Sequence, residues 1–357
     1  MILKFIIGSA GTGKTTTLIK SVNTCDGTVS VLAYTHSAVN NIKERLNKPA
    51  EELNLNNSVE TVETLHKYFQ IDFDNNIHKT KGFTKFIFID EFSLIPLNLF
   101  DSICHILEKH DVIVICVGDI LQLGPVETEI KQIDYSLLKK SLKGDVYDYI
   151  IKRFRCDSAI DYLNLFYHLS TTLFVSKYFQ KADKLILTKC YRHDDEILKL
   201  TTTPLNQLTI LEFDKVIMYI DNLVKVNASF VVLASKYVYL KKIGGMVNKH
   251  DHVIKCGSVN FGDSVILQNN LDKNFHNGDL VKYVNYDTIE QIGQPNTQTL
   301  QLQGLNQMVM PVWLSSIHKS QGREWDYVII VINDMFSYGM MYTAITRAKK
   351  KVIFVKL

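Results

Sequence analysis

The stretch Gly8-Ser9-Ala10-Gly11-Thr12-Gly13-Lys14-Thr15 lies between a short apolar run and a helical pattern. Its glycines let the main chain curl so that successive N–H groups face inward, at the positive end of the following helix dipole. Lys14 can reach the β- and γ-phosphates of a nucleoside triphosphate, and the Thr15 hydroxyl can ligate Mg²⁺. We therefore predict a nucleotide-binding loop formed by Gly8, Ser9, Ala10, Gly11, Thr12, Gly13, Lys14, Thr15 and Thr16.

The residues around this loop alternate between β-rich and helical patterns. Short, β-branched runs that are typical of buried strands occur at Lys4–Ile7, Val29–Tyr34, Lys85–Ile89 and Val112–Val117. Helical patterns separate them at Lys14–Val22, Ala38–Leu46 and Leu99–His110. This βαβα series predicts a parallel sheet that helices cover on both faces.

The later part of the chain predicts a second α/β layer with an insertion. Residues 131–185 have a mostly helical pattern, and strand-like runs return at Lys184–Leu187, Phe230–Ala234, Tyr327–Ile332 and Lys351–Lys356. Within residues 255–312, short alternating runs are separated by glycines (Gly257, Gly262, Gly278, Gly293 and Gly304). Such punctuation favours a small antiparallel sheet or barrel.

Composition narrows the class of protein. The chain has 357 residues, of which 46% are hydrophobic, with a net charge of +3; this excludes a mostly disordered protein. No apolar run approaches the roughly 20 residues that span a bilayer, and the apolar start runs into the glycine-rich loop instead of a signal-peptide cleavage site. The six cysteines are widely spaced, which favours reduced thiols and a cytoplasmic location, or the host cytoplasm or nucleus for a viral protein.

Two further strand ends carry polar residues. Phe86-Ile87-Phe88-Ile89 is followed by Asp90 and Glu91. Because parallel strands end at one edge, we expect Asp90 to hold Mg²⁺ with Thr15, and Glu91 to polarise the attacking water. The next strand is followed by Gly118-Asp119 and Gln122. Gln122 is expected to contact the γ-phosphate or the attacking water, whereas Gly-Asp alone is an ordinary turn.

These segments, in this order, resemble the core of superfamily 1 helicases of the RecD/Pif/Dda-like branch. Segments elsewhere resemble five more of its motifs: residues 33–38 (AYTHSA), 61–66 (TVETLH), 187–192 (LTKCYR), 316–326 (SIHKSQGREWD) and 342–348 (YTAITRA). The resemblance implies an α/β fold of two RecA-like parallel-sheet domains with an SH3-like β insertion in the second. We expect a first domain at 1–135 with a short pin-like insertion near 70–84, a second at 136–254 and 313–357, and the insertion at 255–312.

The resemblance also implies site residues. Arg192 and Arg347, together with Gly322 and Glu324, are expected at the nucleotide, where arginines neutralise charge on the transferred phosphoryl group. The residues expected to contact a single-stranded nucleic acid are Thr35, His36, Thr64, His66, His318 and Lys319. Lys14, Glu91, Gln122, Arg192 and Arg347 are then the catalytic set.

The function implied is an NTP-dependent helicase or translocase on single-stranded nucleic acid, with DNA and 5′-to-3′ movement as in that branch. Mg²⁺ with ATP or another NTP is the expected cofactor, since only seven residues precede Gly8 and the adenine-reading segment of relatives is missing. We expect a monomer with no membrane association and with replication proteins as partners. Alternatives are a nucleic-acid-stimulated NTPase that remodels nucleoprotein or RNA without unwinding DNA duplex, and a phosphate-loop kinase.

Several residues have an ordinary structural interpretation as well. Arg347 and Lys349–Lys351 form a basic run that is usually a solvated helix. His36 and His66 can be core or surface histidines. Phe73 or Phe83 is a candidate strand-separating wedge, although core packing is the usual role of phenylalanine.

Overall fold

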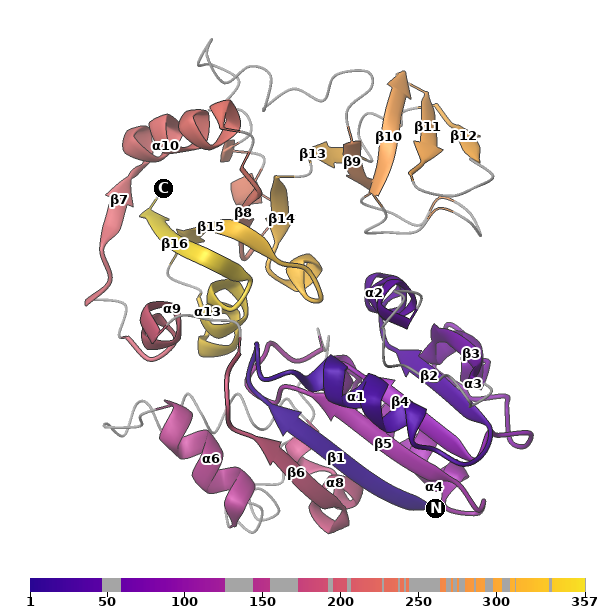
Figure 1. The fold of residues 1–357 in the computed structure, drawn as a ribbon. Helices are drawn as coiled ribbons and strands as arrows, with labels where there is room; N and C mark the ends of the chain where they lie inside the picture. The colour runs from indigo at the N-terminus through magenta and orange to yellow at the C-terminus, as the bar shows by residue number, and fades with distance from the viewer. Residues whose placement is uncertain are drawn as a thin grey trace. The chain divides into compact units, whose positions relative to one another are not determined.

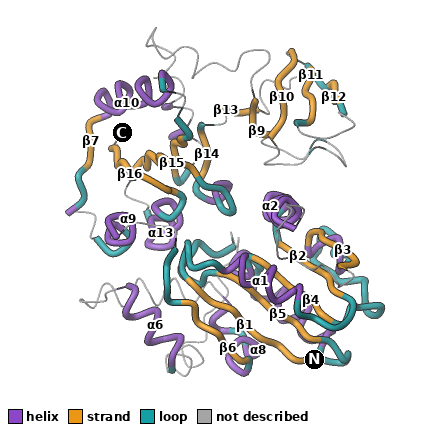
Figure 2. Tube along the Cα trace, viewed as in Figure 1, coloured by secondary structure: helices purple, strands orange, loops and turns teal. Residues whose placement is uncertain are grey.

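The chain forms two compact units, shown in Figures 1 and 2: Met1–His193 with Ser337–Tyr342, and Asp194–Phe336 with Thr343–Leu357. We call them unit 1 and unit 2. The structure is a computed structural model that describes residues 1–46, 59–125, 144–154, 173–191, 195–203, 207–226, 228–236, 238–240, 242–243, 264–267, 271, 275, 280–285, 287–292, 298–303, 309–311, 313–333 and 336–356.

Unit 1 contains a six-stranded sheet in the order β3-β2-β4-β5-β1-β6, and every neighbouring pair is parallel. Its strands are β1 (Ile2–Gly8), β2 (Val29–Ala33), β3 (Val59–Thr64), β4 (Phe86–Asp90), β5 (Ile113–Gly118) and β6 (Asp183–Leu187). Its helices include α1 (Lys14–Asn23), α2 (His36–Leu46), α3 (Leu65–Phe69), α4 (Leu97–Leu107), α6 (Asp145–Phe154) and α8 (Lys177–Lys181). The predicted parallel sheet is thereby confirmed.

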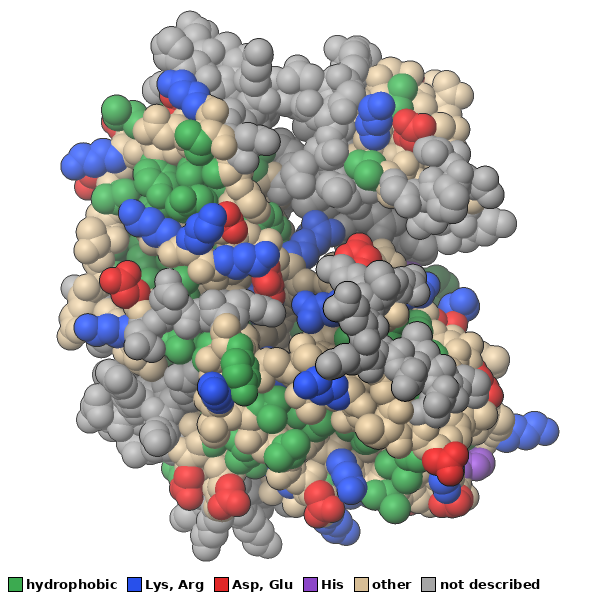
Figure 3. Space-filling model, viewed as in Figure 1, with side chains coloured by type: hydrophobic (Ala, Val, Ile, Leu, Met, Phe, Trp, Pro, Cys, Tyr) green, Lys and Arg blue, Asp and Glu red, His purple; other side chains and the backbone are tan. Residues whose placement is uncertain are grey.

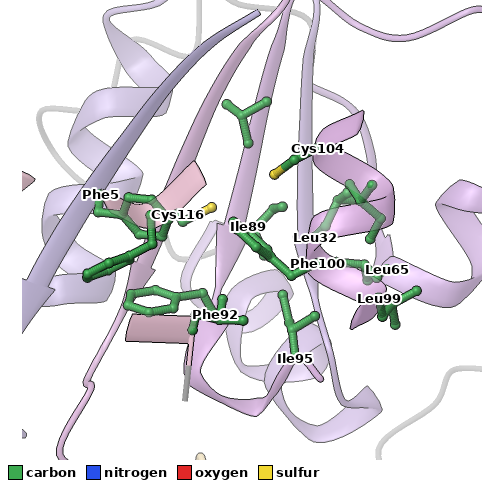
Figure 4. Packing of buried hydrophobic residues seen from close by; sticks show 14 of the residues in the cluster. Phe5, Leu32, Leu65, Ile89, Phe92, Ile95, Leu99, Phe100, Cys104 and Cys116 are labelled. Atoms are coloured by element: carbon green, nitrogen blue, oxygen red, sulfur yellow. The ribbon is translucent and has the colours of Figure 1, made fainter. Parts of the chain in front are cut away.

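Alternate residues of each strand face opposite sides of this sheet, as β geometry requires. Ile6 packs with apolar residues of α1 and α2 on one face. Phe5 and Ile7 belong to the cluster on the other face, which α3, α4, α6 and α8 cover. In Figure 4, labelled side chains of this second cluster, such as Phe92 and Phe100, meet between the sheet and α4. Helices therefore cover both faces of the sheet, and the candidate functional residues lie at the carboxyl ends of its strands.

Strand β6 lies in the first sheet, which corrects the sequence-based placement of residues 184–187 in the second α/β layer. It pairs in parallel with β1, with Gly8 opposite Leu187. Unit 1 accordingly extends to His193 instead of ending near residue 135. An apolar run identifies a strand, but it does not identify the neighbour with which that strand pairs.

Unit 2 contains a five-stranded parallel sheet in the order β14-β8-β15-β16-β7. The strands are β7 (Ile210–Glu212), β8 (Phe230–Ala234), β14 (Leu314–Ser316), β15 (Trp325–Ile332) and β16 (Ala348–Lys356). Helix α10 (Phe213–Lys225) packs Val216 and Ile220 against this sheet. The other described α-helices are α9 (Asp195–Leu200) and α13 (Tyr338–Ile345), and the first residues of α13 belong to unit 1. The basic run at 349–351 is part of β16, so the interpretation as a solvated helix was wrong.

The insertion predicted at 255–312 contains a second sheet of unit 2. Its strands form an antiparallel sheet in the order β12-β11-β10-β9-β13. They are β9 (Ser264–Leu267), β10 (Leu280–Asn285), β11 (Thr288–Gln291), β12 (Thr299–Gln301) and β13 (Val309–Pro311). The cluster of Leu267, Val281, Tyr283 and Ile289 is the core of this small sheet. The prediction of an antiparallel β insertion is confirmed.

The face in Figure 3 shows Lys and Arg side chains distributed among Asp and Glu, as a net charge of +3 leads one to expect. Among the described helices, none combines the length and apolar character that crossing a membrane requires.

Gly118, at the end of β5, allows a close approach of Phe92. An added Cβ would lie 2.7 Å from Cδ1 of Phe92, and that ring is fully buried against Phe5 at 5.1 Å. Because the ring has no room to move, Gly118→Ala is expected to reduce the free energy of unfolding by about 1–3 kcal/mol. Urea unfolding would measure the loss. An unchanged free energy of unfolding in Gly118→Ala would contradict the packing argument.

Candidate nucleotide and nucleic-acid sites

The loop after β1 adopts the curled form that the glycines predict. Gly11 and Gly13 have φ values of 78° and 79°, a left-handed conformation that glycine adopts without strain. Thr12 closes the curl, since its main-chain N–H and its hydroxyl both donate to the carbonyl of Ser9, at 3.3 and 2.8 Å. An added Cβ at Gly8 would lie 2.3 Å from Oγ1 of Thr12. Each glycine therefore serves the loop geometry.

Lys14 begins α1 and points back over this loop. Its Nζ donates to the carbonyl of Ser9 at 2.9 Å and lies 4.0 Å from Oδ2 of Asp119. Thr15 and Thr16 follow in the first turn of α1, half-buried and exposed respectively. The ammonium is thus held above main-chain N–H groups at a helix N-terminus, an arrangement that suits a polyphosphate.

Asp90 and Glu91 follow β4 at the same edge of the sheet. Oδ2 of Asp90 accepts from the Thr15 hydroxyl at 3.4 Å, and its Oδ1 accepts from the Glu91 N–H at 2.9 Å. Burial raises the pKa of Asp90, while the Glu91 N–H, Lys14, Arg45 and Thr15 oppose that rise. Glu91 itself has a left-handed backbone with φ 53°, an uncommon conformation for a non-glycine residue.

The residues present fit Mg²⁺. A hydroxyl and a carboxylate oxygen lie side by side at Thr15 and Asp90, and these hard oxygen ligands are what Mg²⁺ prefers. Among the described residues, no group of three or more His, Cys, Asp or Glu side chains is arranged to hold a metal. Two protein ligands are typical of a Mg²⁺ ion that is bound together with substrate phosphates.

Asp119, which sequence analysis treated as part of a turn, lies beside Lys14 in the candidate site. It is 2% exposed, and its Oδ1 accepts from the Leu121 N–H at 3.1 Å. Its Oδ2 accepts from the Tyr342 hydroxyl at 2.8 Å and from Nε2 of Gln122 at 3.4 Å. Gln122, which we predicted to be catalytic, therefore binds the same carboxylate oxygen that lies 4.0 Å from Nζ of Lys14. The available signal was Gly118-Asp119 at the end of a strand next to β1.

Residues 187–191 pack against the nucleotide loop. The N–H of Tyr191 donates to the carbonyl of Gly11 at 2.8 Å, and Sγ of Cys190 lies 3.5 Å from the carbonyl of Ala10. The motif that resembles the fourth one of the family thus adjoins the loop. Arg192, the predicted catalytic residue of that motif, lies outside the described residues.

The nucleic-acid candidates of unit 1 lie together at the ends of β2 and β3. These strands pair with Ala33 opposite Thr64, and the Tyr34 and His66 rings lie 5.1 Å apart. Burial lowers the pKa of His66. Thr35 accepts from the N–H of Ala38, Thr64 caps α3 by accepting from that of Lys67, and His36 is exposed. Both threonine hydroxyls therefore also have a structural role.

The candidates of unit 2 lie in two neighbouring segments. His318 and Lys319 form a short 3₁₀ helix directly after β14 and are half-buried, and burial lowers the pKa of each. Arg347 is 5% exposed. Its guanidinium donates to the carbonyls of Thr343 and Arg323, at 3.0 and 3.4 Å. Arg347 is therefore adjacent to the segment that carries Gly322, which has φ 76°, and the half-buried Glu324.

The two candidate wedge residues differ in their environment. Phe83 packs on the core beside Phe69 and His110, at ring distances of 5.8 and 5.0 Å. Phe73 is fully exposed, so core packing, the usual role of phenylalanine, does not apply to it. It lies in a turn where Asp72 accepts from the N–H groups of Asp74 and Asn76. Hydrogen bonds, that of the Asn76 N–H foremost, lower the pKa of Asp72 to about 2.

Two family models match the chain. One, described as an AAA domain, matches residues 2–128, and one described as a UvrD-like helicase C-terminal domain matches residues 311–355. These ranges contain the nucleotide loop and Arg347. The family models thus relate residues 2–128 to AAA domains and residues 311–355 to the C-terminal domain of UvrD-like helicases.

Solved structures agree with this fold. Pif1 helicase from Bacteroides in complex with ADP-AlF3 and ssDNA matches with a TM-score of 0.60 and 18% identity, covering 99% of this chain and 88% of that chain. Pif1 helicase from Candida albicans matches with a TM-score of 0.56 and 15% identity, covering 99% and 90%. No curated protein sequence matches this chain.

Lys14→Ala is expected to abolish NTP hydrolysis and to weaken nucleotide binding by about 100-fold or more, because the phosphates lose a charge-assisted partner. Titration of a fluorescent ATP analogue and phosphate release would measure both. Lys20→Ala is the matched control, since Lys20 is exposed in the last turn of the same helix. Robust turnover in folded Lys14→Ala would refute this nucleotide site.

Proposed function

We propose that the protein uses NTP hydrolysis to move 5′ to 3′ along single-stranded DNA and thereby unwinds duplex. One observation carries this proposal. The nucleotide loop follows β1, and four candidate strand-binding residues follow β2 and β3 (Thr35, His36, Thr64 and His66). Both lie at the carboxyl edge of one sheet, with Asp90 and Glu91 after β4 between them. A structural change at the phosphates can therefore be transmitted through this one sheet to the residues that we propose bind the strand.

At the nucleotide, each residue of unit 1 has a separate role. Lys14 and the loop N–H groups bind the phosphates, and Thr15 with Asp90 would hold Mg²⁺, which neutralises phosphate charge when bound. Glu91 is the base that takes a proton from the attacking water. Gln122, next to Asp119, orients that water. The substrate is ATP or another NTP.

Arg192 and Arg347 stabilise the charge that develops during transfer. Arg192 directly follows Tyr191, whose N–H is bonded to the loop. Arg347 belongs to unit 2, next to Gly322 and Glu324, which we assign to the same nucleotide. Its present bonds to Thr343 and Arg323 would exchange for bonds to phosphate.

Thr35, His36, Thr64 and His66 would contact the DNA strand from unit 1, and His318 with Lys319 from unit 2. Because burial lowers the pKa of His66 and His318, the neutral form of both rings is favoured, and we assign them to stacking and hydrogen bonding instead of charge. We further propose a monomer that works with replication proteins in the cytoplasm, or in a host nucleus for a viral protein.

The test of this proposal is NTP hydrolysis with and without single-stranded DNA and RNA, together with unwinding of a forked DNA duplex. DNA-stimulated hydrolysis with unwinding from a 5′ tail is the expected result. Stimulation by RNA, or stimulation without unwinding, would favour the remodelling NTPase. Turnover that oligonucleotides leave unchanged and that phosphorylates an acceptor would indicate a kinase.

Phe73 is proposed as the wedge of the pin-like insertion at 70–84, because it is a fully exposed aromatic ring on a turn held by Asp72. Phe73→Ala is expected to slow unwinding of a forked duplex about ten-fold while single-strand-stimulated hydrolysis stays within two-fold. Asn75→Ala, in the same turn, is the control for a general effect of the turn. A parallel loss of hydrolysis and unwinding in Phe73→Ala would argue against a wedge.

Arg347→Ala is expected to reduce DNA-stimulated hydrolysis by about 10³-fold while single-strand affinity stays nearly intact, because its target is nucleotide phosphate. Arg347→Lys should restore little, since an ammonium lacks the planar fork of a guanidinium. Hydrolysis and strand affinity would be measured on the same samples. Lys351→Ala, an exposed charge on β16, is the control. Full turnover with weakened DNA binding would assign Arg347 to the nucleic acid.

A further inference from the structure

The hydroxyl of Tyr342 is buried inside the nucleotide site of unit 1. Tyr342 is 2% exposed, and its Oη accepts from the main-chain N–H of Ala10 at 3.2 Å. The same hydroxyl donates to Oδ2 of Asp119 at 2.8 Å. It therefore joins the nucleotide loop to the carboxylate beside Lys14, although it lies 332 residues from Ala10 along the chain.

The hydroxyl is suited to be a permanent donor. Burial, with Asp119 as the next cause, raises the pKa of Tyr342 well above its usual value. The raised pKa favours the protonated hydroxyl, which can donate to Asp119. Asp119 in turn has donors on both oxygens, from the Leu121 N–H on one and from Tyr342 and Gln122 on the other.

This arrangement bears directly on Lys14. The Nζ of Lys14 lies 4.0 Å from Oδ2 of Asp119, beyond hydrogen-bond distance, while it donates to the Ser9 carbonyl at 2.9 Å. A carboxylate whose oxygens already accept from neutral donors attracts an ammonium less closely than one that lacks them. Loss of the Tyr342 donor would draw Lys14 onto Asp119, where it competes with the phosphates.

We propose that Tyr342 is a positioning residue for the nucleoside triphosphate. Its hydroxyl keeps Lys14 available to the phosphates by occupying Oδ2 of Asp119, and it fixes the loop through the Ala10 N–H. It touches neither phosphate nor DNA; it acts through Asp119 and the loop. The inference rests on the proposed role of Lys14 at the phosphates.

The test begins with Tyr342→Phe, which removes the hydroxyl and keeps the ring. The KM for ATP and the Kd of a fluorescent ATP analogue are expected to rise about ten-fold, while kcat stays within about three-fold and single-strand affinity without nucleotide is unchanged. Tyr68→Phe is the matched control, because Tyr68 is a buried tyrosine of unit 1 whose hydroxyl also makes two hydrogen bonds, both to Thr84. It should lose similar stability and keep both constants.

A double-mutant cycle with Asp119→Asn separates positioning from a general structural effect. In the Asp119→Asn background there is no charge to capture Lys14, so Tyr342→Phe removes only the bond to the Ala10 N–H and should change the Kd by less than about three-fold. An equal ten-fold effect in both backgrounds, or an unchanged Kd in Tyr342→Phe, would overturn the inference. Wild-type protein that binds ATP without hydrolysing it would refute the proposed function alone, since the Kd values still test Tyr342; wild-type protein that binds no nucleotide would refute both.

Discussion

The parallel direction of the strands in unit 1 is the constraint on which the candidate site depends. Because all neighbours in the order β3-β2-β4-β5-β1-β6 are parallel, their carboxyl ends meet at one edge. That edge receives the nucleotide loop from β1, Asp90 and Glu91 from β4, and Asp119 after β5. The same geometry places the candidate strand-binding residues at this edge as well, after β2 and β3 (Thr35, His36, Thr64 and His66).

The two buried carboxylates at this edge accept hydrogen bonds from neutral side chains and from main-chain N–H groups. Asp90 accepts from Thr15 and from the Glu91 N–H, and Asp119 accepts from Leu121, Gln122 and Tyr342. Buried carboxylates would be costly without such bonds. With them, Lys14 rests on a carbonyl and close to a carboxylate, with its charge still available to an incoming polyphosphate. Because Asp90 and Asp119 accept hydrogen bonds from other donors, the Lys14 ammonium can still interact with phosphate.

Strand and helix positions followed from the sequence where one period dominated. The runs at 29–34, 85–89 and 112–117 became β2, β4 and β5 within one or two residues, because β-branched runs between turn signals have few alternatives. The pairing of β6 with β1 did not follow, since a strand's partner depends on tertiary packing. The secondary structure of β16 also depended on tertiary packing. Its run of lysines is a pattern that is typical of a solvated helix, but Ile353 and Val355 of the same segment pack into the core of unit 2.

The sequence alone was enough to predict the nucleotide loop, the acidic strand end and the motifs that resemble those of superfamily 1 helicases. Glycines and a lysine at fixed spacing have a local physical meaning, because a curled main chain is needed wherever the fold places it. Only the tertiary structure decided that Asp119 and Tyr342 share a hydrogen bond at Lys14, and that Phe73 is exposed whereas Phe83 is packed. Such facts depend on which distant segments meet, and burial of apolar faces governs that choice over the whole chain.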